Sequence, residues 1–186
     1  LTELLPAMSL AYEHPENNIM NMKPRIVSED RLISIPLLAY SYFQAGLIIT
    51  ICTFTAYFLS FDYFGISSRE VTEFDGRFFT DAPIGDYVSY KGHVFTEERQ
   101  IEIMSVVHGT YYLAIVMCQA VHIWTCRTMF VSLFEHGIFS NEATNVGVPI
   151  SVAIGLAIVY FPPFQYLDGA GGALFLVIVY ITLMAI

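Results

Sequence analysis

The chain has 186 residues, of which 55% are hydrophobic and only 13% are charged, whereas about a quarter of an ordinary globular domain is charged. A soluble domain of this size could bury a core, but it would not need 15 Phe and 12 Tyr with so few charges. The net charge of −9 argues against a nucleic-acid partner, because phosphates require clusters of Lys and Arg that this sequence lacks.

Charged residues are absent from four long stretches of the chain. These stretches cover residues 32–61, 103–126, 143–167 and 169–186. A hydrocarbon core about 30 Å thick requires roughly 20 helical residues, so the first three stretches are long enough and the last is close to the limit. The sequence therefore predicts an all-α integral membrane protein, a helical bundle surrounded by lipid.

The predicted topology alternates apolar spans with polar loops. The end of a transmembrane helix is expected at 1–11, and transmembrane helices at 35–60, 100–126, 145–163 and, truncated, at 164–186. The loops between them are expected at 12–34, 61–99 and 127–144. No internal repeat is apparent.

The basic residues predict the orientation. Lys23, Arg25 and Arg31 lie in the first loop, and the positive-inside rule places that loop in the cytoplasm. The loop 61–99 carries eight acidic and three basic residues up to Glu98, so we expect it outside the membrane. The loop 127–144 is then cytoplasmic, two crossings later.

Few polar side chains lie within the apolar segments. Glu3 is the one carboxylate of the opening segment; it faces either an ion, a cavity or a partner helix, or simply water at a helix end. His108, Gln119 and His122 share one face of the predicted 100–126 helix, because their spacings of eleven and three residues match helical turns. Such a face serves interhelical hydrogen bonding or an ion path.

Other chemistry has little support in the sequence. Cys52, Cys118 and Cys126 fall in or beside apolar spans, as expected of small buried apolar residues. Two histidines without a third nearby ligand predict no metal site. The sequence contains no phosphate-binding glycine loop, nucleophile elbow or paired-cysteine motif, so we expect no catalytic residues and no cofactor in this segment.

The first motif of the chain is LPAMSLAYE at residues 5–13, continued by NNIM at 17–20 and KPR at 23–25. This series resembles the end of the sixth membrane helix and the following cytoplasmic loop of P-type cation-transporting ATPases, in the branch of the sodium/potassium and proton/potassium pump alpha subunits. Similar segments follow in the family's order: RLIS at 31–34, FDGRFFTD at 74–81, residues 98–108, QAVHIWTCRT at 119–128 and SLFEHG at 132–137. The resemblance is weaker beyond residue 137.

The resemblance implies an architecture and a set of partners. The chain would comprise the end of the sixth transmembrane helix and four further helices of such a pump, in contact with lipids and with the rest of the pump polypeptide. The parent protein would use ATP and magnesium and move monovalent cations across the plasma membrane, while this segment alone would not be catalytic. An accessory subunit would contact the 61–99 loop.

The resemblance also assigns roles to single residues. Glu3 stands where the family has an ion-coordinating aspartate, and Gln119 where sodium pumps have a glutamine near their third sodium site. His122 replaces an aspartate of that site, and Pro149 with Ile150 stands where a pair of glutamates is expected. A third sodium site is therefore in doubt.

The accessory-subunit contact differs from the family as well. Ser89 and Tyr90 are retained, but residues 91–93 depart from the family's pattern, which weakens the expectation of that partner. Two other interpretations compete with a pump region: a non-catalytic structural subunit derived from a pump, and, with less support, a small independent transporter or channel.

Overall fold

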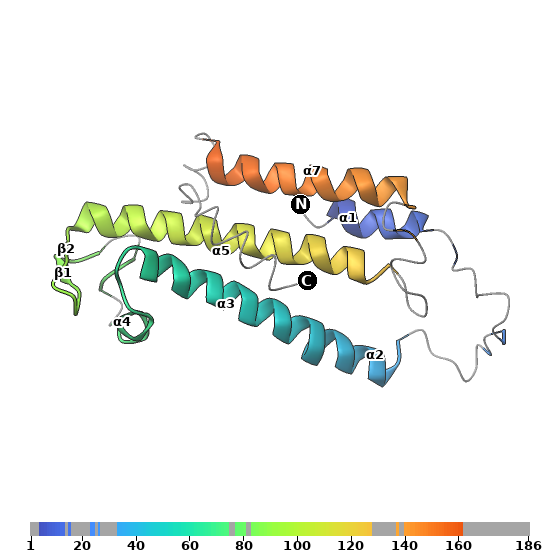
Figure 1. Ribbon diagram of the computed structural model, residues 1–186, viewed down its shortest axis with the longest axis horizontal. Coiled ribbons are helices and arrows are strands. Elements are labelled where there is room, and N and C mark those ends of the chain that lie inside the picture. The colour runs from blue at the N-terminus through green and yellow to red at the C-terminus, as the bar shows by residue number, and fades with distance from the viewer. Residues whose placement is uncertain are drawn as a thin grey trace.

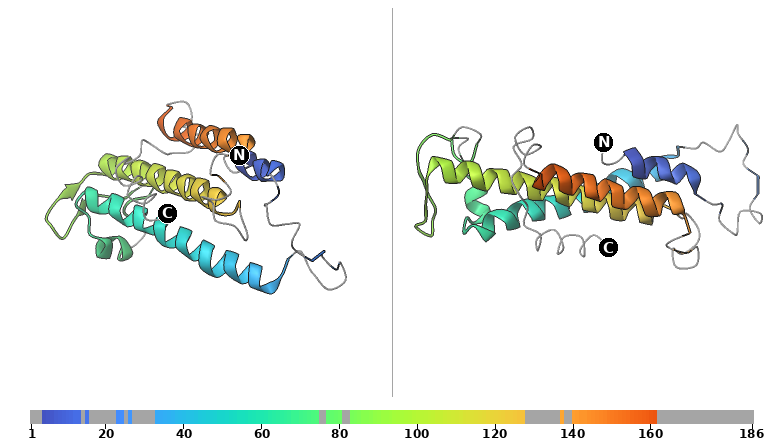
Figure 2. Two further views of the ribbon diagram at one scale, coloured as in Figure 1. Left: turned by 45° about the vertical axis from the view of Figure 1, so that its right-hand side comes forward. Right: turned by 90° about the horizontal axis from the view of Figure 1, so that it is seen from above.

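The computed structural model is a set of long helices that run side by side (Figure 1). The helix α5 lies between α3 and α7, and the short α1 lies against α7 (Figures 1 and 2). The structure describes residues 4–13, 15, 23–24, 26, 33–74, 77–80, 83–127, 137 and 140–161.

The first long helix is continuous but contains a π-helical turn. It consists of α2 (Ile35–Ala39), the π segment η3 (Tyr40–Ala45) and α3 (Gly46–Tyr63). Ser34 precedes it, and its side chain accepts a backbone N–H of the first turn at 3.3 Å, which satisfies one of the free donors of a helix start. Pro36 lies in that turn, where its missing N–H costs least.

Two further long helices complete the described bundle. They are α5 (Glu97–Thr125) and α7 (Glu142–Tyr160). The segment α1 (Leu4–Ser9) continues into one 3-10 turn, η1 (Leu10–Tyr12). Acidic residues in the first turns of α5 and α7 interact favourably with the helix dipole.

Small residues allow the helices to approach one another closely. The interface between α3 and α5 contains Cys52, Ala56, Ala114 and Cys118, all buried. A Cβ atom added at Gly155 of α7 would lie 3.3 Å from a Val116 methyl group of α5. One added at Gly147 would lie 3.4 Å from the carbonyl oxygen of Leu5 in α1. Such contacts between small residues are typical of helix pairs in lipid.

The outward face of the α2–η3–α3 helix is strongly apolar. Large side chains on this face are exposed, among them Tyr42, Phe43, Leu47, Ile51 and Phe54. A soluble protein rarely exposes so much contiguous apolar surface. Among the described residues, three helices are long and apolar enough to cross a membrane: Ile35–Tyr63, Glu97–Thr125 and Glu142–Tyr160. The predicted all-α membrane fold is therefore confirmed.

The segment between α3 and α5 folds into a cap over one end of the bundle (Figure 1). It contains α4 (Ser68–Thr72) and a small antiparallel hairpin, β1 (Tyr87–Val88) and β2 (Val94–Phe95). Phe61 and Phe79 form the centre of an aromatic cluster, with ring centroids 5.7 Å apart. Further rings pack around this pair: Tyr57, Phe64, Phe74, Phe78, Tyr87 and Phe95.

Gln100, in the first turns of α5, fastens this cap. Its side chain has no solvent exposure. Its amide nitrogen donates to the carbonyl oxygens of Gly85 and Phe95 at 2.9 and 3.1 Å, and its oxygen accepts the N–H of Phe79 at 3.1 Å. Phe79 has a positive φ of 52°, which is unusual for a bulky residue, and this hydrogen bond helps to hold it there.

The helix bounds differ from the predicted spans by a few residues. The span predicted at 100–126 begins at Glu97, and the span predicted at 145–163 is α7, which begins at Glu142. Both helices start earlier than the charge-free stretches predict, because acidic residues in a first turn favour a helix N-terminus. The predicted final span, 164–186, lies outside the described residues.

The close contact at Gly155 yields a test of the packing. We expect Gly155→Leu to destabilise the bundle by about 1–3 kcal/mol, because the added side chain overpacks the α5–α7 interface. Ala153→Leu, on an exposed position of the same helix, serves as the matched control and should change stability little. Thermal unfolding in detergent measures both, and equal melting temperatures for the two variants would contradict the packing described here.

Candidate functional site

The three polar side chains predicted to share a face all lie on α5. His108 is exposed, while Gln119 and His122 are half-buried. Within the part of the chain that the structure describes, no hydrogen bond joins these three side chains to another helix. The His122 ring contacts Cys126, the C-cap of its own helix, whose sulfur lies 3.4 Å from the Nε2 atom. The roles assigned to these side chains therefore remain predictions.

His122 lines a small cavity between α5 and the π segment η3. The cavity has a volume of about 150 Å³, enough for a few water molecules. Its polar lining includes Gln44 from η3 and His122, Cys118 and Thr125 from α5. A π turn often occurs at functional positions in helices, and here it brings Gln44 to the cavity that His122 also lines.

Glu3, the predicted ion ligand, lies outside the described residues. The helix that follows it is described, and its last turn enters a polar network. We call this network the end network; it consists of Ser9, Glu13, Arg127, Ser140, Asn141 and Thr144.

The centre of the end network is a bidentate ion pair. Arg127 donates from Nε and Nη2 to the two carboxylate oxygens of Glu13, each at 2.9 Å. The Arg127 side chain is 0% exposed and the Glu13 side chain 13%. A buried guanidinium needs a counter-ion, and removing one partner of such a pair costs about 3–5 kcal/mol. The pair joins residues that are 114 positions apart in the chain.

Asn141 links this ion pair to α7. Its Oδ1 atom caps the start of α7 by accepting the Thr144 N–H at 3.2 Å. Its Nδ2 atom donates to Glu13 at 2.7 Å and to the carbonyl oxygen of Ser9 at 3.2 Å. Arg127 also donates to the Ser140 hydroxyl at 2.8 Å. The ends of α1 and α5 and the start of α7 are thus fixed to one another.

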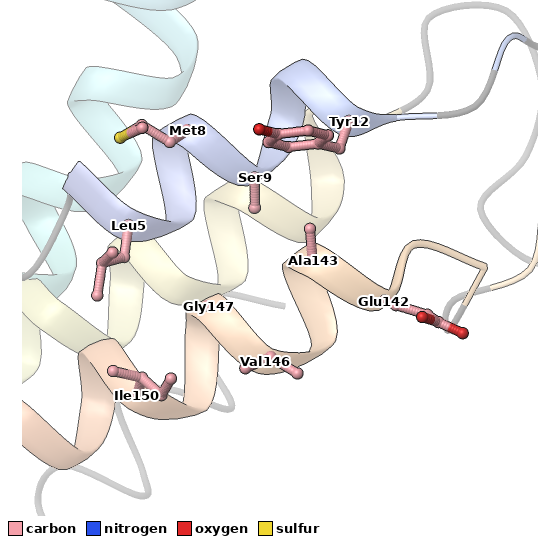
Figure 3. A pocket seen from close by; sticks show the side chains of 9 residues that line it. All are labelled: Leu5, Met8, Ser9, Tyr12, Glu142, Ala143, Val146, Gly147 and Ile150. Carbon is pink, nitrogen blue, oxygen red and sulfur yellow. The ribbon is translucent and has the colours of Figure 1, made fainter.

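An apolar groove lies beside this network, between α1 and α7 (Figure 3). Its volume is about 420 Å³. Its lining residues are Leu5, Met8, Ser9, Tyr12, Glu142, Ala143, Val146, Gly147 and Ile150. Gly147 lies where the α1 backbone comes close, and Glu142 lines the end of the groove at the first turn of α7 (Figure 3). The described residues contain no group of three or more His, Cys, Asp or Glu side chains that could hold a metal ion.

A second polar centre lies in the cap, around Glu70. This side chain is 1% exposed and accepts the Ser67 N–H at 2.7 Å, the Ser89 hydroxyl at 3.0 Å and the Tyr90 N–H. Burial raises the pKa of Glu70, but the hydrogen bonds from Tyr90, Ser67 and Ser89 outweigh it, so the pKa lies below its ordinary value of 4.5. Glu70 is therefore ionised and ties α4 to the hairpin.

Tyr90 stands beside this centre on the outer surface of the hairpin. Its hydroxyl donates to Glu73, and this hydrogen bond raises the pKa of Tyr90 and lowers that of Glu73. Tyr90 remains largely exposed. Of the two residues that match the family's pattern here, Ser89 is buried and bonds Glu70 through its hydroxyl, whereas the ring of Tyr90 is exposed.

Sequence reasoning did not identify Glu13, Arg127, Asn141, Glu70 or Gln44 as site residues. Glu13 and Arg127 are at the ends of apolar segments, where charges are ordinary, and only the fold brings them together. Glu70 is one of eight acidic residues in its loop. The Ser67-x-x-Glu70 spacing of a capping box was the one local signal available.

The fold and these centres define a class of protein: a polytopic α-helical membrane protein with a buried polar centre at each end of its described helices. The chain matches the family described as Cation transporting ATPase, C-terminus, over residues 1–185. It belongs to this family, and the predicted relationship to P-type cation-transporting ATPases is confirmed.

Individual relatives are pump alpha chains. The human potassium-transporting ATPase alpha chain 2 is 29% identical over 159 residues, 86% of this chain and 15% of the relative. The Xenopus laevis potassium-transporting ATPase alpha chain 1 is 27% identical over 87% of this chain and 16% of its own length. The Drosophila melanogaster sodium/potassium-transporting ATPase subunit alpha is 28% identical over 87% and 15%. The chain thus spans about 15% of the length of these relatives.

Glu70 yields a prediction about the pH dependence of the cap. Because its pKa is lowered on folding, its contribution to stability is present above the unfolded pKa near 4.5 and is lost as the pH falls through the lower folded value. At pH 7 we expect Glu70→Gln to lower the free energy of the local opening that exposes the Tyr90 N–H to solvent by about 1–3 kcal/mol. In the unmodified protein, protonation of Glu70 in acid should lower this free energy by a similar amount.

Hydrogen exchange at the Tyr90 amide, corrected for the intrinsic rate at each pH, measures this effect. Glu98→Gln is the control, because Glu98 is an exposed acid in the first turn of α5 and its loss should leave Tyr90 protected. If both variants exchange Tyr90 at the same rate, Glu70 does not hold the hairpin.

Proposed function

We propose that this chain is the C-terminal membrane region of an ATP-driven pump that exchanges monovalent cations across the plasma membrane. The family match over residues 1–185 carries this proposal, together with relatives whose names specify potassium or sodium/potassium transport. Binding and hydrolysis of ATP with magnesium would take place elsewhere in the parent protein. This region would support the ion-binding helices.

Within this function, Glu3 is the proposed cation ligand of the segment. It directly precedes α1, and a carboxylate in an apolar helix is costly unless an ion, a cavity or a partner occupies its surroundings. Hard cations prefer oxygen ligands of this type. Gln119 is proposed as a weaker contributor from α5, where it is half-buried. Interhelical hydrogen bonding is proposed for His108 and His122.

The cap is proposed to lie outside the cell and to meet an accessory subunit. Its hairpin exposes Val88, Tyr90 and Val94, and Glu70 holds the hairpin against α4. Edges of short exposed strands and aromatic side chains are suited to contacts with a partner chain. The start of α7 and the ends of α1 and α5, which the end network joins, lie at the other end of the bundle (Figure 1). This end is proposed to be cytoplasmic.

The role of Glu3 is tested in the intact parent pump. Glu3→Gln removes the charge while nearly preserving volume, and it should raise the cation concentration for half-maximal ATP hydrolysis by at least roughly tenfold, or about 1.4 kcal/mol. Glu102→Gln is the matched control, since Glu102 belongs to an exposed ion pair with Arg99 and should not change cation activation. Unchanged cation activation of the Glu3 variant would show that Glu3 is a solvated helix-end residue.

His122 gives a second test, concerning the number of ions moved. A neutral imidazole offers one nitrogen in place of two charged oxygens and suits transition metals better than Na⁺. We therefore expect no third sodium site. Charge movement per ATP in the reconstituted parent should fall below the roughly one net charge of a three-for-two exchange, and His122→Asp alone should not restore it. A measured three-sodium cycle would refute this assignment.

A further inference from the structure

The end of α5 carries a cysteine and a histidine side by side. Cys126 is the C-cap of α5, and its sulfur lies 3.4 Å from Nε2 and 3.7 Å from Nδ1 of His122, one helical turn earlier. The sequence predicts small buried residues at all three cysteines. That prediction holds for Cys52 and Cys118 but is wrong for Cys126, which is exposed because α5 ends there.

The backbone of the last helical turn holds these two side chains together. The Cys126 N–H donates to the His122 carbonyl oxygen at 3.0 Å, so the helical hydrogen-bond pattern continues to the C-cap. Residues four apart in such a turn are neighbours on one face of the helix. The Thr125 hydroxyl donates to the same carbonyl at 2.8 Å. The sulfur and the imidazole are therefore placed by a regular turn, and little conformational freedom is lost when both bind one ion.

The separation of the two atoms matches the spacing of neighbouring ligands on zinc. Zinc bonds thiolate sulfur at about 2.3 Å and imidazole nitrogen at about 2.0–2.1 Å, in tetrahedral geometry. These bond lengths and the tetrahedral angle place a sulfur and a nitrogen ligand about 3.5 Å apart. The sulfur of Cys126 and Nε2 of His122 are 3.4 Å apart. One zinc ion can therefore bind both atoms without movement of the backbone.

The type of ligand and the surrounding charges favour the same ion. Thiolate and imidazole ligands suit zinc, whereas hard cations such as magnesium and calcium prefer oxygen ligands. Arg127 directly follows Cys126, but its guanidinium is fully buried and paired with Glu13 at 2.9 Å. An incoming divalent cation therefore meets a guanidinium whose charge is already balanced.

Water would complete the coordination of the ion. The pair supplies two ligands, and the described part of the chain has no group of three or more His, Cys, Asp or Glu that could hold a metal. The cavity of about 150 Å³ that His122 lines has room for a few water molecules. Tyr40 and Gln44 line it as well and are able to hydrogen-bond water on the metal, as outer-shell groups do. Structural zinc sites are closed by four protein ligands, so a site of this kind binds its ion reversibly.

We propose that His122 and Cys126 form a binding site for one zinc ion at the end of α5, with water in the remaining coordination positions. The Cys126 thiol gives its proton to solvent as the zinc–sulfur bond forms, and His122 binds through Nε2 of its neutral ring. No oxidation or reduction takes place. The bound ion would join the last turn of α5 to its C-cap, directly before Arg127 of the end network. The site is independent of the cation role proposed for Glu3.

The test measures the protection of Cys126 from alkylation by iodoacetamide in the intact parent pump, purified in detergent, over a series of zinc concentrations. Mass spectrometry reports the modification of this residue alone, so zinc bound elsewhere does not interfere. Zinc should suppress the alkylation, because the thiolate is the nucleophile and the metal occupies it. Zinc should also slow the carbethoxylation of His122 by diethyl pyrocarbonate, with the same half-effect concentration. Magnesium at equal concentration should slow neither reaction.

His122→Gln removes one of the two ligands and should raise the zinc concentration for half-maximal protection of Cys126 by at least about tenfold. His93→Gln is the matched control, because His93 is an exposed histidine of the cap, and it should leave this concentration unchanged. If zinc fails to protect Cys126 in the unmodified pump, the site is refuted, whether or not the variant accumulates. Equal protection in the His122 variant and the unmodified pump also refutes it, since Cys126 would then bind zinc without the imidazole.

Discussion

A backbone that crosses lipid must satisfy its own hydrogen bonds, and the arrangement of this chain depends on that constraint. The crossing segments are long helices, and hydroxyl groups within them bond to their own backbone, as Ser60 does to the Ala56 carbonyl at 2.7 Å and Thr110 to the Val106 carbonyl at 2.8 Å. The described ionic and amide side chains that join distant parts of the chain gather at the two ends of the bundle. Gln100 and Glu70 organise one end, and Glu13, Arg127 and Asn141 the other.

Apolar side chains in lipid give helices little reason to prefer one neighbour over another, because the acyl chains are equally apolar. Specificity must therefore come from shape and from the polar ends. Along α5, shape is set by small residues that face α3 and by Val116 against Gly155 of α7. Near its start α5 supplies Gln100 to the cap, and two residues after its end Arg127 joins the end network. The central helix and the residues just after it thus contribute a polar side chain to the network at each end of the bundle.

The sequence was sufficient for properties that depend on local composition. Stretches without charge predicted the helices at 35–60, 100–126 and 145–163. In the structure α5 and α7 begin three residues earlier, at acidic first turns, while the first helix extends to Tyr63 and α7 ends at Tyr160. The family was predicted from short motifs and is confirmed. Properties that depend on pairs distant in the chain could not be predicted. Arg127 and Glu13 are ordinary charged residues at the ends of apolar segments, and only the fold pairs them. Glu70 differs from the neighbouring acidic residues only because Ser89 and Tyr90 fold over it. No local sequence signal marks the π turn.

The π turn of η3 has a geometric consequence for the first long helix. A π turn accommodates about one residue more than an α turn, and each residue of an α-helix rotates the chain by roughly 100°. Side chains before Tyr40 therefore point in a direction rotated from the one that a regular helix would give them. Deleting a single residue within Tyr40–Ala45 would remove this offset and turn the whole Ile35–Ala39 segment about the helix axis relative to α5. Homologous helices that differ by one residue here would thus present different faces to the same neighbour, although both would still cross the membrane.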